Sequence, residues 1–154
     1  MLHKLCRESD AAVFRYVDSS YSDLGKIAQP RDSDGSTWNL NPTPISISGD
    51  LADADLIAGT TLHKVGATTS WTYGTITGTC LTVQVVDLNG NYTGKYFLCQ
   101  YDANFSMNLG DSGSPVFLHA SNGTAHFAGL LWGTGGYFSP LEGIQYDLGT
   151  LSPL

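Results

Sequence analysis

The sequence predicts an all-β protein with many short strands and turns. Hydrophobic residues make up 42% of the 154 residues, whereas charged residues make up only 14%. The chain also contains 18 glycines and 8 tyrosines, a composition that favours strands joined by turns. Turn residues separate most of the apolar runs at short intervals, as in a small antiparallel barrel or sandwich. This length suffices for one core of ordinary size.

The first part of the chain contains one predicted strand and a long connector. The strand covers residues 11–16 and follows directly after Asp10. Residues 19–44 have no clear periodicity, and prolines at positions 30, 42 and 44 stand among Asp, Ser and Gly. Because proline and glycine interrupt regular structure, we expect this stretch to be an irregular connector.

From Ile45 onward the predicted strands follow one another at short intervals. They cover residues 45–48, 61–65, 72–79 running on through 81–86, 95–100, 115–118, 125–132 and 143–146. The last segment, residues 144–151, is alternatively a short helix. The chain has no internal repeat, coiled coil or low-complexity tract.

Charge and composition exclude several classes of function. The formal net charge is −7 with only 7 Lys and Arg, and no basic cluster is present, which argues against binding to nucleic acid. No apolar run approaches the length that spans a membrane. The histidines and carboxylates lack the spacing of metal ligands, so we expect neither a metal nor another cofactor.

The three cysteines suggest one disulfide and one unpaired thiol. The turn at residues 87–91 contains Asn89-Gly90, a strong hairpin signal. Cys80 and Cys99 lie on the two runs that this turn joins, so they could pair as a cross-strand disulfide. Cys6 would then require a partner outside the chain. The alternative is three reduced thiols in a β core, as is usual in the cytosol.

The first ten residues, MLHKLCRESD, contain no apolar signal core and no small-residue cleavage site. We therefore expect either a cytoplasmic protein or a chain that begins partway through a longer one. The odd cysteine favours the second interpretation.

The segment 109–116, LGDSGSPV, is the strongest chemical signal in the chain. It places Ser112 on a tight turn between glycines, where backbone N–H groups of Gly110 and Ser112 could form an oxyanion hole. Ser112 is therefore the candidate nucleophile. Pro115 opens a strand, which argues against a strand-to-helix nucleophile elbow. The alternative is an ordinary polar loop between strands.

Further segments carry a resemblance to a known family. Gly129-Leu130-Leu131-Trp132-Gly133 closes a predicted strand, Ser9-Asp10-Ala11-Ala12-Val13 places a carboxylate at the mouth of another, and residues 66–75 are rich in glycine and threonine. With these, the chain resembles the chymotrypsin-like (trypsin-like) serine peptidases, particularly bacterial secreted members, from Asp10 to about Gly149. The resemblance implies an antiparallel Greek-key barrel like the second barrel of these enzymes, plus the last strand of the first. It implies a first-barrel remnant at 1–18, a connector at 19–44 and the second barrel at 45–154.

The resemblance also implies roles for individual residues. Ser112 matches the nucleophile, Asp10 the triad aspartate, Gly110 and Ser112 the oxyanion-hole donors, and Asp111 the buried acid that shapes the loop. Leu131, Trp132 and Gly133 match the strand that pairs with substrate and lines the primary specificity pocket. Ser106 is similar to the residue at the pocket floor, where a neutral side chain would suit an apolar substrate residue. For Asp10 the alternative is a turn residue at the start of a strand.

The catalytic histidine of the family has no counterpart at the expected position. In the family it precedes the aspartate by tens of residues, but only nine residues precede Asp10, and His3 is too close to serve. His63, His119 and His126 lie in or beside predicted strands of the second barrel, where structural roles are more common. The resemblance therefore implies a missing N-terminal barrel segment that carries the base and a partner for Cys6.

The function implied is that of a secreted, extracellular serine endopeptidase that acts on a peptide or protein substrate through an acyl-enzyme on Ser112. Whether the chain is active alone remains open. One alternative is a non-catalytic β-barrel module that binds a peptide or protein. Another uses a different base, such as Lys64 or Lys95.

Overall fold

Nearly all of the regular structure is β-strand. The computed structural model describes residues 5–12, 18, 20, 23–31, 40–87 and 89–151. Its strands are β1 (Leu5–Arg7), β2 (Lys26–Ile27), β3 (Ile45–Asp50), β4 (Thr61–Gly66), β5 (Ser70–Val86), β6 (Tyr92–Ala103), β7 (Pro115–His119), β8 (Ala125–Leu131) and β9 (Tyr137–Pro140). A 3₁₀ helix covers Asp53–Asp55, and the helix α1 covers Leu141–Leu148.

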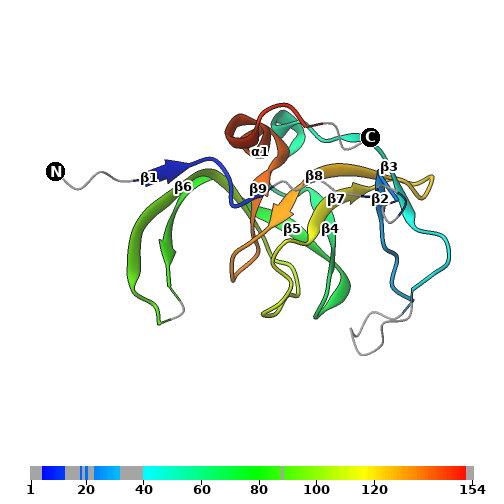
Figure 1. Cartoon of the computed structure of the whole chain (residues 1–154), viewed down its shortest axis with the longest axis horizontal. Coiled ribbons are helices and arrows are strands. Elements are labelled where there is room, and N and C mark those ends of the chain that lie inside the picture. The colour runs from blue at the N-terminus through cyan, green and yellow to red at the C-terminus, as the bar shows by residue number, and fades with distance from the viewer. Residues whose placement is uncertain are drawn as a thin grey trace.

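Six of these strands close into an antiparallel barrel (Figure 1). The ring runs β6-β5-β4-β7-β8-β9 and returns to β6, and every neighbouring pair is antiparallel. Within it, β7 lies beside β4 and thus closes the order β7-β4-β5-β6, which is a Greek key. The predicted all-β, antiparallel Greek-key barrel is therefore confirmed.

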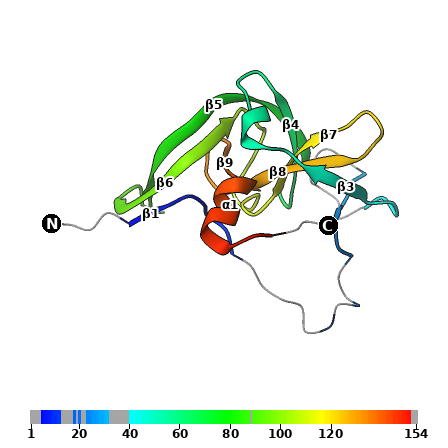
Figure 2. The same ribbon diagram turned by 90° about the horizontal axis from the view of Figure 1, so that it is seen from above.

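The remaining strands extend the barrel at its edges. β1 pairs in parallel with the part of β6 that continues beyond the barrel, and β3 pairs in parallel with β8. β2 adds to β3 as a short antiparallel strand. The long β5–β6 hairpin leaves the barrel with β1 alongside it, and α1 packs against β8 and β9 (Figure 2).

Two apolar clusters stabilise this arrangement. The larger one fills the barrel, because alternate residues of each strand point inward. Its members are Leu56, Leu62, Ile76, Tyr101, Ala103, Phe105, Val116, Ala128, Leu131 and Phe138. The smaller one joins Ile27 and Ile45 of the β2–β3 pair to Phe117 and Ala125 on the outer side of the barrel. The segment before the barrel is thus packed against it.

The end of the chain corrects one predicted strand. Residues 143–146 lie in the helix α1, so the helical alternative is right, although α1 begins earlier, at Leu141. Pro140 precedes α1 with an extended backbone, and Gly149 follows it with a φ of 89°, which only glycine adopts readily. In a strand Ile144 and Tyr146 would share one face, whereas the helix buries Ile144 and leaves Tyr146 exposed.

Three short strands were not predicted, because two to four residues carry no periodicity of their own. They are β1, β2 and β9, and each depends on a partner strand from elsewhere in the chain. Ala11 and Ala12 lie in no strand, and the rest of the strand predicted at residues 11–16 lies outside the described residues.

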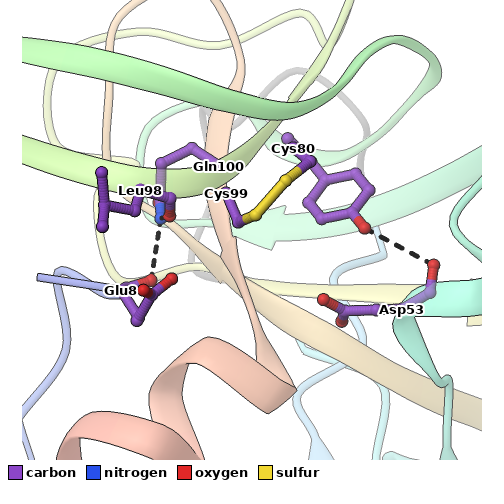
Figure 3. Close-up of a disulfide and its surroundings, with 7 residues drawn as sticks. Glu8, Asp53, Cys80, Leu98, Cys99 and Gln100 are labelled. Carbon is purple, nitrogen blue, oxygen red and sulfur yellow. Dashed lines mark hydrogen bonds between the residues drawn. A yellow bond between two sulfur atoms is a disulfide. The ribbon is translucent and has the colours of Figure 1, made fainter.

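The predicted disulfide is present. Cys80 of β5 and Cys99 of β6 are bonded to each other across the hairpin (Figure 3), and Cys6 on β1 is a free, exposed cysteine. At the hairpin tip, the Asp87 carboxylate accepts the backbone N–H groups of Asn89 and Asn91. This turn brings the two cysteine-bearing strands into register.

Candidate active site

Ser112 is exposed on the loop that joins β6 to β7. Its hydroxyl Oγ donates a hydrogen bond to the carbonyl oxygen of Trp132 at 3.2 Å. The flanking backbone is tied to the end of β8, because Gly113 N–H donates to the Leu131 carbonyl at 2.7 Å and Leu131 N–H donates to the Ser114 carbonyl at 3.0 Å. The loop is therefore held at the rim of the barrel.

Two backbone amides of this loop have no acceptor in the part of the chain that the structure describes. Among the described residues, neither Gly110 N–H nor Ser112 N–H donates a hydrogen bond. Gly110 has a φ of 100°, a conformation that side chains disfavour, and a Cβ there would also crowd the Thr68 hydroxyl. The glycine thus permits a backbone path on which the N–H groups of Gly110 and Ser112 have no acceptor among the described residues.

Asp111 anchors the loop from inside the protein, with a fully buried side chain. Its oxygen Oδ1 accepts the N–H groups of Thr68 at 2.8 Å and Thr69 at 3.1 Å. Its oxygen Oδ2 accepts the Thr69 hydroxyl at 2.6 Å and the Asn108 N–H at 3.0 Å. The carboxylate therefore joins the β4–β5 turn to the serine loop.

Lys64 of β4 supplies the countercharge. Its Nζ lies 3.3 Å from Asp111 Oδ2 and bonds to the Thr69 hydroxyl, and both charged side chains are fully buried. Burial alone would raise the pKa of Asp111, but the hydrogen bonds, that of the Thr69 hydroxyl first, lower it to about 2. Burial lowers the pKa of Lys64 more than the charge of Asp111 raises it. Asp111 thus remains a carboxylate at neutral pH.

Asp10 lies on a segment that docks against the barrel through its backbone. Its N–H donates to the Ser139 hydroxyl at 3.0 Å, and just before it Glu8 N–H and Ser9 N–H donate to the Asp147 carboxylate of α1. Asp10 is itself exposed, and its carboxylate forms no hydrogen bond or ion pair with the described residues.

The candidate substrate strand begins at Leu131, whose side chain lies in the barrel core. Trp132 N–H and Gly133 N–H both donate to the Tyr137 carbonyl, at 3.0 Å and 3.3 Å. The indole ring of Trp132 stacks on Tyr137 at 5.7 Å and meets the edge of Phe97 at 4.8 Å. The Trp132 ring therefore contacts two other aromatic rings, while its backbone carbonyl contacts the Ser112 loop.

Ser106, the candidate for the pocket floor, is exposed at the start of the same loop. Its carbonyl accepts the Thr72 hydroxyl at 2.9 Å and lies 3.1 Å from the Thr69 hydroxyl oxygen, whose proton is donated to Asp111. The glycine- and threonine-rich segment singled out in the sequence thus holds both ends of the serine loop.

No described side chain contacts Ser112 as a base. His63 Nδ1 accepts the indole N–H of Trp71 at 3.0 Å, and its ring lies 5.5 Å from that of His119. Burial, and then the charge of His119, lowers the pKa of His63. Lys64 is engaged with Asp111, and Lys95 lies on the hairpin opposite Leu5. The structure therefore does not bring either candidate lysine to the serine hydroxyl.

The structural roles of two residues in this region are not predicted by the sequence analysis. Lys64 was considered only as a base, although a buried acid requires a partner and this lysine alternates with outward-facing residues of β4. Gln100 was not singled out at all. Its side chain is fully buried and bonds to Trp132, and nothing local in the sequence marks it.

Within the described part of the chain, no helix has the length and apolar character needed to cross a membrane. The same residues contain no group of three or more His, Cys, Asp or Glu side chains placed to hold a metal ion.

Neither a protein-family model nor a curated protein sequence matches the chain. Solved structures of bacterial serine proteases do match its fold. Protease A of Thermobifida fusca has a TM-score of 0.53 and 24% identity over 71% of this chain and 55% of its own. Chymotrypsin of Cellulomonas bogoriensis has a TM-score of 0.53 and 22% identity over 82% of this chain and 60% of its own.

A glutamic acid-specific serine protease, which uses a histidine triad in substrate binding, has a TM-score of 0.52. It is 20% identical over 85% of this chain and 75% of its own. The chain spans less than two thirds of the first two proteases. At these identities the likeness concerns the fold. The six-stranded barrel described above is therefore the barrel of the chymotrypsin-like serine proteases, and this chain has that fold.

Proposed function

We propose that the chain is the nucleophile-bearing part of a serine endopeptidase that cleaves peptide bonds through an acyl-enzyme on Ser112. The observation that carries the proposal is the Ser112 loop. Its exposed hydroxyl lies on the same short turn as two backbone amides that have no acceptor among the described residues, and the buried Asp111 holds that turn in place. A preorganised pair of N–H donors is what the oxyanion of acyl transfer requires.

In this mechanism Ser112 Oγ attacks the carbonyl carbon of the scissile bond, and the N–H groups of Gly110 and Ser112 stabilise the oxyanion. Asp111 does not take part in proton transfer, because its oxygens are occupied by four hydrogen bonds and by Lys64. The substrate backbone would lie along Leu131, Trp132 and Gly133.

Asp10 would orient a histidine base that a further segment supplies, the N-terminal barrel segment inferred from the sequence. Its exposed, unpaired carboxylate is available for such a partner. Loss of one triad member removes a factor of about 10⁴ or more in turnover in this chemistry, so the chain without a histidine at Ser112 should turn over slowly. The neutral Ser106 suits an apolar substrate side chain.

The disulfide fits an extracellular protein, because such bonds persist in oxidising compartments. We accordingly place the peptidase outside the cell, with a peptide or protein as substrate and no cofactor in the reaction.

The proposal is tested by labelling the 154-residue chain with a fluorophosphonate, which reacts with activated serine hydroxyls. Imidazole added to the solution serves as a substitute base. We expect labelling at Ser112, accelerated by imidazole and lost in Ser112→Ala, with the modified residue located by mass spectrometry. Ser121, an exposed serine of the β7–β8 turn, is the internal control. Labelling of Ser112 no faster than that of Ser121 would contradict the proposal.

A second candidate is a barrel that binds a peptide without cleaving it. No described side chain lies beside Ser112 as a base, which is compatible with binding alone. The Trp132 ring, which contacts the rings of Phe97 and Tyr137, offers an aromatic surface to a peptide. This second candidate predicts that Ser112→Ala leaves peptide affinity unchanged and that no cleavage occurs when imidazole is supplied.

A further inference from the structure

Gln100 lies in the middle of β6, and its side chain is fully buried. Its Oε1 accepts the indole N–H of Trp132 and the hydroxyl of Ser139, each at 2.8 Å. Its Nε2 donates to the carbonyl of Glu8 at 2.8 Å (Figure 3) and to that of Leu98 at 2.6 Å. All the principal hydrogen-bonding positions of one buried amide are therefore filled.

The partners determine the direction of every bond. An indole N–H can only donate, and a carbonyl can only accept, so Oε1 must face Trp132 and Nε2 must face Glu8 and Leu98. The Ser139 hydroxyl then has to donate to Oε1, which leaves its lone pairs for the N–H of Asp10 at 3.0 Å. The chain of bonds runs without a break from Asp10 to Trp132.

The Trp132 carbonyl is also the acceptor of the Ser112 hydroxyl. One side chain thus links the backbone of the Asp10 segment to the strand that contacts the candidate nucleophile. These elements are far apart in sequence, since Gln100 and Glu8 are separated by 92 residues. A buried polar network of this kind holds its members in one arrangement only while every bond is made.

We propose that Gln100 is a positioning residue that couples the docking of segment 8–10 to the placement of the Trp132 strand. The functional meaning of this coupling rests on the proposed peptidase function, because the coupling relates the segment that bears Asp10 to the candidate substrate-binding segment at Trp132. Gln100 touches neither substrate nor the reacting atoms, and it acts through Ser139 and Trp132. A substrate that orders Trp132 would thereby favour the docked state of the Asp10 segment, and the reverse also holds.

The substitution Gln100→Glu separates this role from simple packing, because it preserves shape. When protonated, the introduced carboxyl can still accept from Trp132 and Ser139 and donate to one carbonyl. When ionised, it has no donor and faces the carbonyl oxygens of Glu8 and Leu98. The coupling between Asp10 and Trp132 should therefore depend on pH in this variant. If Gln100 acted only by filling space, the coupling would not change with pH.

The test is NMR on the full chain at pH 5 to 9, following the indole N–H resonance of Trp132 and the exchange protection of the Asp10 amide. We expect Asp10 protection in Gln100→Glu to fall about tenfold as the carboxyl ionises, a loss of the size expected for a broken hydrogen bond to a buried group. The Trp132 indole resonance should move with the same midpoint. Gln84→Glu, the same change at an exposed site on β5, should show neither effect. The Asp147 carboxylate, which accepts the N–H groups of Glu8 and Ser9, is present in every variant and so does not distinguish them.

Ser139→Ala is the second variant. It tests whether Asp10 and Trp132 are coupled even if Gln100→Glu does not fold. It removes the Asp10 acceptor, so Asp10 protection should fall at every pH, and the Trp132 indole resonance should shift because both groups share Gln100 Oε1. A change at Asp10 with no change at Trp132, in either variant, overturns the proposal.

The peptidase function fails separately. If an uncleaved peptide neither binds nor shifts Trp132, and Ser112 is not labelled, the function is wrong. The coupled response of Asp10 and Trp132 in the unliganded variants would still establish Gln100 as the link between them.

Discussion

Asp53, which is partly buried, and Asp111, which is fully buried, show how hydrogen bonds decide the effect of burial on a carboxyl pKa. Burial raises the pKa of Asp53 to about 6, with the charge of Glu142 as the second cause. One Asp53 oxygen is buried without a hydrogen-bond partner among the described residues. At Asp111 burial acts in the same direction, but four hydrogen bonds outweigh it and bring the pKa to about 2. The number of donors, more than the depth of burial, separates the two groups.

Asp111→Asn should destabilise the protein strongly. The substitution leaves Lys64 buried with no countercharge, which typically costs about 3–5 kcal/mol. The measurement is the free energy of unfolding in urea at pH 7. Asp23→Asn is the matched control, because Asp23 and Lys26 are also 3.3 Å apart but exposed, and such pairs contribute about 0–1 kcal/mol. Equal losses in the two variants would contradict the burial argument.

The same carboxylate predicts a pH dependence. The folded pKa of about 2 lies below the ordinary aspartate value of 3.8, so the unfolded chain binds more protons between these values. The stability that Asp111 contributes is therefore present above about pH 4 and lost as the pH falls toward 2. Asp111→Asn should show a weaker decline in stability over this window than the wild type.

At the scale of the element, the turn between β8 and β9 depends on two adjacent glycines that differ in their surroundings. Gly135 and Gly136 have φ values of 100° and 98°. A Cβ at Gly135 would find only the Tyr137 ring, at 3.9 Å, whereas one at Gly136 would overlap the carbonyl oxygen of Ala103. Gly136 is required by the close approach of β6 as well as by its own backbone.

We expect Gly135→Ala to cost about 1–2 kcal/mol, the price of a left-handed backbone for a residue with a side chain. Gly136→Ala should lose at least about 1–3 kcal/mol more, because the methyl group also overpacks the turn against β6. Urea midpoints of the two variants test this difference. Similar losses would mean that backbone conformation alone explains both glycines.

Elements with strong local patterns were predicted well, and those without were not. Strands β3 to β8 have apolar runs bounded by turn residues, and all were expected within a few positions. β9 has four residues after a glycine-rich turn, and it forms because β6 and β8 present open edges on both sides. For the end of the chain the sequence predicts either a strand or a short helix, because the apolar residues of this segment fit both.

At the scale of the whole molecule, closure of the barrel and the disulfide act on different parts of the β5–β6 hairpin. β4 and β9 flank its barrel portion, whereas the Cys80–Cys99 bond joins the strands where the hairpin continues outward. The bond closes a sequence separation of 19 residues. Restricting the unfolded chain over such a loop corresponds to about 3 kcal/mol of stability.

Reduction of the disulfide should therefore lower the free energy of unfolding by about 3 kcal/mol. Urea unfolding with and without a reductant measures the change, in a Cys6→Ala background so that no third thiol can exchange. The double variant Cys80→Ser, Cys99→Ser is the control and should not respond to the reductant. An unchanged midpoint on reduction would show that strand pairing alone holds the hairpin.

Strands β3 to β8, the disulfide and the position of Ser112 on a glycine-flanked turn can all be predicted from local sequence. These features depend on neighbours within a few residues, or on strands joined by one tight turn, so local physical chemistry suffices to specify them. The fold class followed from the same patterns. The residue types of the Ser112 loop predict acyl-transfer chemistry, and in the structure two amides of this loop have no acceptor among the described residues.

The side chains that surround that loop cannot be predicted from local sequence, because they follow from the tertiary structure. The pairing of Lys64 with Asp111, the contacts of Gln100 and the docking of Glu8 on Asp147 join residues 47, 92 and 139 positions apart (111 − 64 = 47 for the ion pair). Such contacts form because closing the barrel brings distant side chains into one water-poor interior, where each polar group must find a partner. Local sequence patterns therefore do not predict which distant residues will pair.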